Sequence, residues 1–390
     1  MNKPPNTTVI FKDIPPETSN WLVGIDTKFF SINQLLKGIK NIPRGLHYLH
    51  YSLPTVSTEN SIEATQTSIR YGSWIDCQDD VIFLVWDPRI EKFHLVDENN
   101  NLESLNYSKY ISSLGDIYNH TIEYPEDQTQ WTTLINCLDM ELVQEFLPYI
   151  SMKYTDEINT VTPSREENMI LLDQLQQKDS SRHYEDPKQE ELKYTIIQFK
   201  KNRPNASVEE ISADYLDKSW YIEELYGSDT DLLLGELQLS FLMFVIIGNF
   251  CSGLQWMNLL KLISMSKSFS DNKHFNLKFL KVFKAQLEQL PEEYVEDTVS
   301  LNSAVDTKNF IGILENFVRD IYHEKWNEDC CGKMKMNGMI NQQWQSVKEL
   351  IRNKFHIDLS TLQPSIDDDK FEVFDLKDYD ENDEDSPAIA

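Results

Sequence analysis

The histidines and cysteines of this chain are dispersed, a pattern unlike that of a metal-binding site. His47 and His50 stand three residues apart in a predicted strand, and no glutamate lies between them as in a helical zinc motif. Cys330 and Cys331 are adjacent, without a second cysteine pair at metal-ligand spacing. We therefore expect ordinary histidines and unpaired thiols at these positions, with no metal centre and no cofactor.

The segment GNFCSG, residues 248–253, superficially resembles a loop that presents a nucleophile. A nucleophile elbow follows a strand, whereas this segment follows a helical run, so we interpret it as a turn between helices with Gly248 and Asn249 as C-cap residues. The sequence has no Walker loop and no dinucleotide-binding fingerprint. We expect a protein that is not an enzyme; an enzyme whose dispersed residues meet only in the folded chain stays a third possibility.

Four serines alternate with other residues in a predicted turn around Lys267: Ser264, Ser266, Ser268 and Ser270. A phosphate would add about −1.5 to −2 charge to this turn, enough to order or break a contact. We take phosphorylation of this turn, as a switch on a contact, as a hypothesis. The alternative is an unmodified polar loop.

The C-terminal segment combines acidic residues with apolar ones. Residues 367–385 contain eleven Asp or Glu against two Lys, and such a segment cannot bury enough apolar surface to fold alone. Its apolar residues predict a strand that adds to the edge of a partner's sheet, with the acids suited to a basic partner surface. The alternative is a tail that only keeps the protein soluble. The residues predicted to bind are Phe371, Val373, Phe374 and Leu376.

The charge of the whole chain restricts the class of partner. Acidic residues outnumber basic ones 64 to 36, for a formal net charge of −28. Nucleic-acid binders concentrate Lys and Arg because neutralised phosphates supply most of their affinity, so we expect no direct nucleic-acid binding. A protein partner with a basic surface is favoured. A partial alternative explanation is that the acids merely keep an aromatic-rich chain soluble.

The pattern of residues 1–154 predicts a mainly β N-terminal domain with a packing helix. The apolar run 81–86, the turn residues 87–89 and the strand-like run 92–96 are typical of a hairpin. Further strands are expected near 21–25, 29–32 and 46–51, which favours a sandwich-like or barrel-like domain. From Trp131 to Phe146 the apolar residues recur at helical spacing, and Pro148 stops that run.

The rest of the chain predicts a polar linker, a helical domain and the acidic tail. Residues 155–192 are the linker, with one short helix over 166–177, and a strand is expected at 194–199. Residues 193–366 predict an all-α C-terminal domain of six or seven helices, with a capping box at Ser207 and Glu210. The apolar helix over 231–250 is expected to be buried in that domain, because its longest apolar run has nine residues and a membrane span needs about 20. Residues 367–390 form the tail.

Several segments, in order, resemble the AAR-two (A-one-alpha-two repression) family of splicing factors. The most specific are GELQLSF at 235–241 and GNFCSGLQW at 248–256. The others are KGIKNIPRGLH at 37–47, RYGSWIDC at 70–77, YTIIQF at 194–199, LDKSWY at 216–221 and LPEEY at 290–294.

The resemblance implies an α+β multidomain protein with a β-sandwich-like N-terminal domain and a VHS-like helical domain. It implies an assembly factor or chaperone of the U5 snRNP in pre-mRNA splicing. Such a factor binds the RNase H-like and MPN-type domains of the large U5 scaffold protein. It thereby competes with the spliceosomal helicase until maturation. It further implies a monomer in cytoplasm and nucleus, without membrane attachment. In the family a Pro-containing segment after the acids adds the docking strand. If residues 387–390 are its equivalent, the docking strand is short, or residues 371–376 supply it instead. The competing hypothesis is a helical-domain adaptor in trafficking or signalling.

Overall fold

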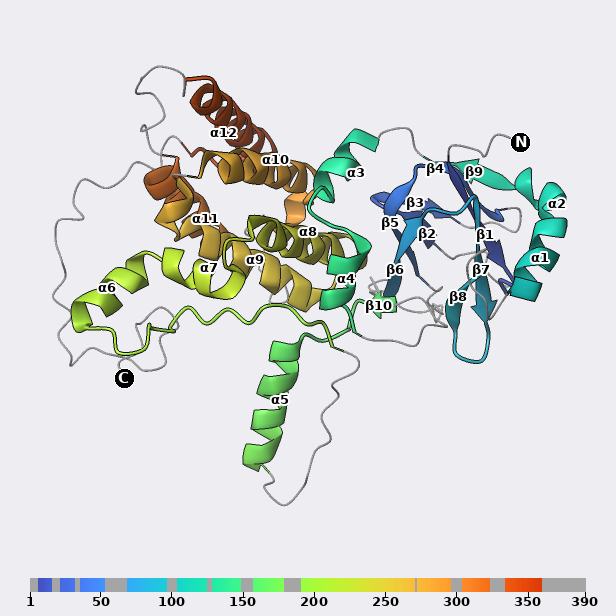
Figure 1. Ribbon diagram of the computed structural model, residues 1–390, viewed down its shortest axis with the longest axis horizontal. Coiled ribbons are helices and arrows are strands. Elements are labelled where there is room, and N and C mark those ends of the chain that lie inside the picture. Colours follow the sequence, from blue (N-terminus) through green and yellow to red (C-terminus); the bar gives the residue numbers. More distant parts are fainter. Residues whose placement is uncertain are drawn as a thin grey trace, which may run out of the picture. The chain divides into compact units, whose positions relative to one another are not determined.

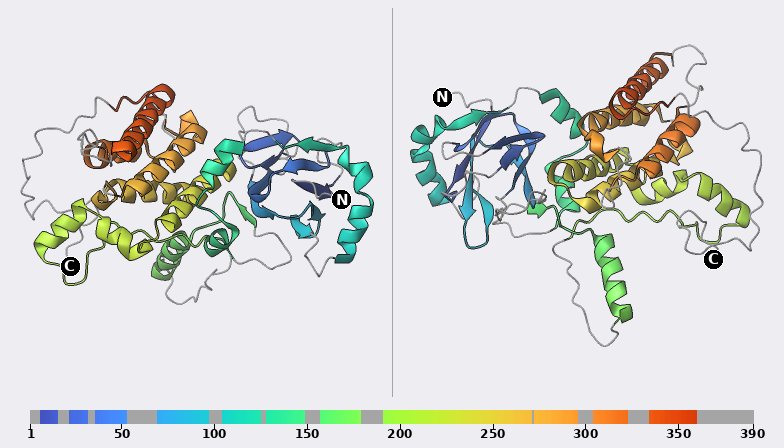
Figure 2. Two further views of the ribbon diagram at one scale, coloured as in Figure 1. Left: turned by 45° about the horizontal axis from the view of Figure 1, so that its top comes forward. Right: turned by 180° about the vertical axis from the view of Figure 1, so that it is seen from behind.

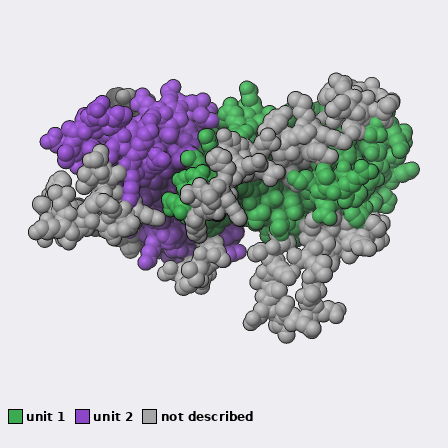
Figure 3. All heavy atoms as spheres, turned by 90° about the horizontal axis from the view of Figure 1, so that it is seen from below, with its two compact units in different colours: residues 1–194, 242–252 green, residues 195–241, 253–390 purple. Residues whose placement is uncertain are grey.

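The computed structural model describes residues 6–15, 22–31, 36–52, 69–96, 104–124, 128–148, 157–178, 191–270, 272–295, 304–322 and 334–359 (Figure 1, Figure 2). The chain divides into two compact units, coloured separately in Figure 3. Unit 1 comprises residues 1–194 and 242–252, and unit 2 comprises residues 195–241 and 253–390.

Unit 1 contains two five-stranded sheets among its described residues. The first sheet has the order β8-β7-β1-β4-β9, and the second has the order β10-β6-β5-β2-β3. The β1–β7 and β4–β9 pairs are parallel and the other pairs are antiparallel. The first sheet is formed by β1 (Thr7–Lys12), β4 (Gly38–Ile42), β7 (Val81–Asp87), β8 (Lys92–Val96) and β9 (Thr121–Glu123). The second is formed by β2 (Leu22–Ile25), β3 (Lys28–Ser31), β5 (Gly45–Ser52), β6 (Arg70–Cys77) and β10 (Glu157–Asn159).

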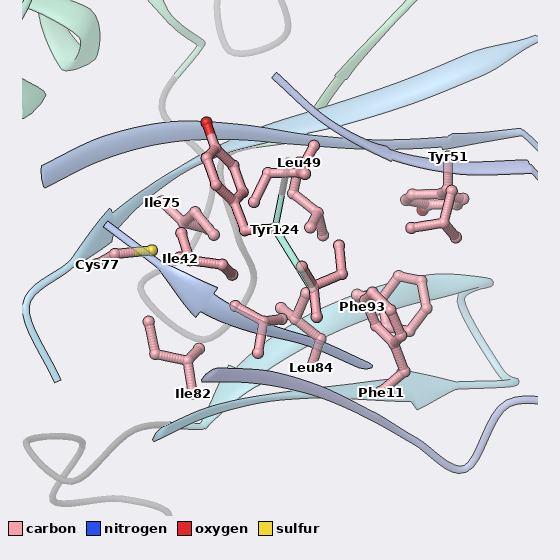
Figure 4. Packing of buried hydrophobic residues seen from close by; sticks show 14 of the residues in the cluster. Phe11, Ile42, Leu49, Tyr51, Ile75, Cys77, Ile82, Leu84, Phe93 and Tyr124 are labelled. Atoms are coloured by element: carbon pink, nitrogen blue, oxygen red, sulfur yellow. The ribbon is translucent and has the colours of Figure 1, made fainter. Parts of the chain in front are cut away.

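The core of unit 1 lies between the two sheets. Phe11, Ile82 and Leu84 come from the first sheet and Leu49 and Ile75 from the second, and all belong to one buried cluster. Figure 4 shows such side chains reaching from strands of both sheets into the shared space. Alternate residues of each strand face this core, as the period of two in a strand requires. The expected sandwich-like arrangement and the hairpin from β7 to β8 are confirmed.

Helices cover the other face of the first sheet, which explains why residues 81–86 are continuously apolar. Phe83 and Val85 point away from the inter-sheet core and pack with Tyr107 and Tyr110. These tyrosines lie on α1 (Ser104–Ser112), which α2 (Leu114–Tyr118) follows. A strand that is buried on both faces carries apolar residues at consecutive positions.

The single helix predicted from Trp131 to Phe146 is wrong, because the structure has two helices there. They are α3 (Gln128–Leu134) and α4 (Met140–Phe146). Asp139 begins α4, and its side chain accepts a hydrogen bond from the backbone N–H of Leu142 at 2.8 Å. An N-cap of this kind stabilises a new helix start and so separates two helices whose apolar periods continue.

Residues 155–192, predicted as a linker, contain β10, which pairs with β6, and the helix α5 (Arg165–Lys178). The predicted short helix over 166–177 is thereby confirmed. A bridge between Ser164 and Leu192 brings the two ends of the α5 region together within unit 1.

The helices of the C-terminal region, α6 to α12, confirm the α+β class. Their bounds are Val208–Leu216 (α6), Ser219–Tyr226 (α7), Thr230–Ile247 (α8), Phe250–Ser264 (α9), Lys273–Gln289 (α10), Thr307–Asn316 (α11) and Met334–Phe355 (α12). Short 3₁₀ turns span Lys267–Ser270 and Glu292–Tyr294, and a π turn spans Phe317–Ile321. The predicted capping box is confirmed: Ser207 and Glu210 satisfy each other's backbone N–H groups at the start of α6.

The helix α8 is long and apolar enough to cross a membrane, alone in this among the described residues. However, 78% of its 18 residues are buried inside the protein. This burial is that of a core helix, as the sequence predicts.

The strand predicted at residues 194–199 is wrong. The backbone there is extended but belongs to no sheet. Its polar groups bond instead to side chains: Thr195 N–H donates to Glu236, and Gln198 N–H donates to the hydroxyl of Tyr221. β-branched residues, here the consecutive Thr195, Ile196 and Ile197, fit any extended backbone, so the sequence cannot distinguish a strand from a segment held by helices.

Candidate functional sites

The predicted tail site, Phe371, Val373, Phe374 and Leu376, lies outside the described residues. Cys330 and Cys331 lie outside them as well. The structure therefore places neither group.

The four serines of the predicted phosphorylation turn differ in accessibility. Ser264 and Ser266 are fully buried, and their hydroxyls donate to backbone carbonyls of α9 one turn earlier. Ser268 is exposed on the 3₁₀ turn, which also contains Ser270. Because a kinase must reach the hydroxyl, the geometry directs the phosphorylation hypothesis to Ser268 among the serines whose side chains are described.

The turn that carries Ser268 is attached to the start of α7. Ser268 N–H donates to the Ser219 hydroxyl at 2.9 Å, and Lys267 N–H donates to Asp217 Oδ1 at 3.1 Å. The hydroxyl of Ser219 donates to the same Asp217 oxygen. A phosphate on Ser268 would place negative charge near the carboxylate of Asp217, which would weaken these contacts.

His47 and His50 both bond to one buried acid, Asp26. Asp26 accepts hydrogen bonds from His47 Nδ1 at 2.8 Å, from Tyr48 N–H at 2.9 Å and from the Tyr124 hydroxyl at 2.5 Å. His50 Nε2 lies 3.0 Å from the backbone oxygen of Asp26 and donates to it. The group joins β5 to the β2–β3 turn and to Tyr124, so its role is structural.

Burial changes the acidity of this group. It lowers the pKa of His50 to about 3, so the ring is neutral at physiological pH. Burial, and then the negative charge of Asp26, raise the pKa of Tyr124.

The predicted turn between helices is confirmed at Gly248 and Asn249, but residues 250–253 already belong to α9, and Asn249 caps the start of α9 where a C-cap was predicted. Helix α8 ends at Ile247, Gly248 adopts a left-handed φ of +69°, and α9 begins at Phe250. Asn249 precedes α9 and acts as its N-cap, because its Oδ1 accepts from the N–H of Ser252 at 3.0 Å. Burial raises the pKa of the Cys251 thiol, which makes this cysteine a poor nucleophile.

Asn249 also makes long-range contacts that the sequence does not reveal. Its Nδ2 donates to the carbonyls of Asn159 at 3.1 Å and Thr162 at 2.9 Å, in the turn after β10. Nearby, the Thr160 hydroxyl donates to the carbonyl of Ile247, and Arg70 donates to that of Ile246. The end of α8 and the start of α9 are thus fixed within unit 1 by side chains that satisfy helix-end carbonyls.

A second missed site is the buried carboxylate of Glu236 on α8, in unit 2. It accepts four hydrogen bonds of 2.7–2.8 Å, from Thr195 N–H, the Thr195 hydroxyl, the Tyr226 hydroxyl and Gln255 Nε2. Burial raises the pKa of Glu236, partly offset by these hydrogen bonds. One signal was available in the sequence: Glu236 is an acid within the most apolar helix, and a buried charge requires partners.

The comparisons with known proteins match both parts of the chain. Residues 5–148 match the family model described as the AAR2 N-terminal domain, and residues 194–360 match the AAR2 C-terminal repeat region. The A1 cistron-splicing factor AAR2 of Saccharomyces cerevisiae is 29% identical over 313 residues, which cover 76% of this chain and 81% of the relative. The AAR2 homologue of Homo sapiens is 24% identical over 324 residues, covering 75% and 78%. That of Caenorhabditis elegans is 21% identical over 332 residues, covering 79% and 85%.

Proposed function

Because the chain belongs to the AAR2 (AAR-two) family, we propose that it is an assembly factor of the U5 snRNP. In this role it binds the large U5 scaffold protein through that protein's RNase H-like and MPN-type domains and delays binding of the spliceosomal helicase. The observation that carries the proposal is the similarity, across both units, to a yeast protein whose name makes it a splicing factor.

The chemistry of the described residues supports a role in binding. The side chains of His50, Cys77 and Cys251 are buried, and burial lowers the pKa of His50 and raises the pKa of both thiols, so that all three favour the neutral form. A net charge of −28 fits a protein partner with a basic surface and would speed their encounter. We propose a monomer that acts in the cytoplasm and nucleus.

Two finer proposals concern the contact with the partner. The tail residues Phe371, Val373, Phe374 and Leu376 add a strand to a sheet edge of the scaffold protein. Phosphorylation at Ser268 separates the 3₁₀ turn from Asp217 and Ser219 and promotes release. For the tail, deletion after Ile366 tests the idea, and unchanged affinity would refute it. For release, Ser268→Asp is expected to weaken the complex and Ser268→Ala to preserve it.

The main proposal is tested by affinity purification of the tagged full-length chain at moderate salt. We expect the U5 scaffold protein to co-purify without the helicase, and added helicase to compete with the chain. Binding is expected to weaken as salt rises, because part of the attraction is electrostatic. Recovery of membrane or receptor components in place of U5 proteins would instead favour a trafficking or signalling adaptor.

A further inference from the structure

The start of the helix α5 is firmly attached to unit 1. The Glu167 N–H donates to the Ser164 hydroxyl, and the Glu167 carboxylate accepts from the Ser164 N–H, which forms a capping box. One residue later, Asn168 donates to Glu191 at 2.8 Å in a buried contact. In Figure 1 the rest of α5 extends away from the two sheets of its unit.

Beyond this attachment, α5 exposes apolar side chains around its circumference. Met169, Ile170 and Leu171 are 51%, 53% and 53% exposed, and Leu172 and Leu175 are partly exposed. Successive helix residues are about 100° apart, so these five side chains surround most of the helix and leave one polar stripe, formed by Glu166, Asp173 and Gln177. They cover about 10 Å of helix length, or about two turns. Contiguous large apolar side chains that stay exposed on a folded protein mark an interaction site, which indicates that a partner surface covers Met169, Ile170 and Leu171.

The charges of α5 indicate the chemistry of that surface. Its described side chains include three acids, Glu166, Glu167 and Asp173, against one base, Arg165. Burial and the adjacent charge of Glu167 both raise the pKa of Glu166, so the two carboxylates repel each other at the helix start. A cationic group from a partner would relieve this repulsion.

We infer that α5 is a docking helix that inserts its apolar surface, residues 169–175, into an apolar groove of a protein partner whose rim carries Lys or Arg beside Glu166 and Glu167. This recognition mode places an amphipathic or apolar helix in a complementary groove. The inference rests on the proposed function in taking the U5 scaffold protein as this partner.

The test uses the purified full-length chain and the purified U5 scaffold protein. The double variant Ile170→Asp with Leu171→Asp is expected to weaken their affinity at least tenfold and to leave the thermal unfolding midpoint unchanged. The matched control is Val208→Asp, which changes a 79% exposed apolar residue on α6 and is expected to stay within twofold of the wild type. Glu166→Lys tests the cationic rim and is expected to weaken binding most at low salt.

Each outcome distinguishes the inference from the function on which it rests. If the wild type does not bind the scaffold protein, the proposed function fails. If the wild type binds and the double variant binds equally well, only the docking helix is refuted. A large fall in the unfolding midpoint would show that α5 packs within the chain, and self-association lost in the double variant would assign the surface to a second copy. Tighter binding by Glu166→Lys would exclude a cationic rim.

Discussion

The side-chain amide of Asn249 donates to the backbone carbonyl of Thr162 at 2.9 Å, across 87 residues of sequence. The Oδ1 atom of the same side chain accepts a hydrogen bond from the N–H of Ser252 and so caps the start of α9. One residue therefore performs a local task, the helix cap, and a long-range one within unit 1. Its position in the GNFCSG segment explains why a nucleophile-like motif can be structural.

Replacing Asn249 with Ala is expected to lower the free energy of unfolding of unit 1 by about 2–4 kcal/mol, because buried carbonyls and the Ser252 N–H lose their partner. Urea unfolding monitored by circular dichroism measures the change. Asn353→Ala, on the exposed side of α12, is the control and should leave the midpoint unchanged or slightly higher. Equal midpoints for the two variants would contradict the role given to Asn249.

The buried histidine His50 makes stability depend on pH. Its folded pKa of about 3 lies below the ordinary 6.5, so the unfolded chain binds one more proton between these values. The free energy of unfolding therefore falls as pH decreases below 6.5, by up to about 1.4 kcal/mol per pH unit from this residue. Urea unfolding at several pH values should show a shallower slope for His50→Gln than for the wild type. Parallel slopes would show that His50 does not supply the effect.

The close approach of Gly24 to His50 predicts that substitution by alanine changes stability very differently at Gly24 and at Gly115. A Cβ at Gly24 would lie 1.9 Å from His50 Cε1 and 2.6 Å from the carbonyl of Lys28. Gly24→Ala is thus expected to destabilise by about 2 kcal/mol or more. Gly115→Ala, in α2 with no atom within 4 Å of the new Cβ, should stabilise by up to about 1 kcal/mol. Thermal unfolding compares the two, and a Gly24→Ala variant as stable as the wild type would contradict the packing.

Glu236 is expected to hold the extended segment at Thr195 in place. Glu236→Ala leaves four donors without an acceptor and should cost about 3–5 kcal/mol. Glu236→Gln should cost less, because the hydroxyls of Thr195 and Tyr226 can rotate to accept from the amide. Proteolysis between unit 1 and α6, read by mass spectrometry, should accelerate in the Ala variant.

The raised pKa of Glu236 gives this site a pH dependence opposite in sign to that of His50. The folded chain holds the proton to a higher pH than the unfolded chain, so the contribution of Glu236 to stability falls as pH rises above 4.5 through the raised pKa. The cost of Glu236→Gln should therefore shrink as pH rises above 4.5. A cost that grows with pH would mean that the carboxylate is stabilised in its charged form.

The local features of this protein were determined by its sequence. The strands β7 and β8, the capping box of α6 and the buried α8 follow from hydrophobic periods and cap residues that act over a few positions. The resemblance carried by ordered short segments identified the family. The acidic composition alone determined the favoured class of partner.

Tertiary structure alone decided how separate segments satisfy each other. The extended residues 194–199 bond to helix side chains about 20 to 60 positions away, and Asn249 bonds to carbonyls about 90 positions away. The burial of Ser264 and Ser266, and the exposure of Met169 to Leu171, likewise depend on what packs nearby. Periodicity records which residues are apolar, whereas the partner of a polar group depends on the path of the whole chain.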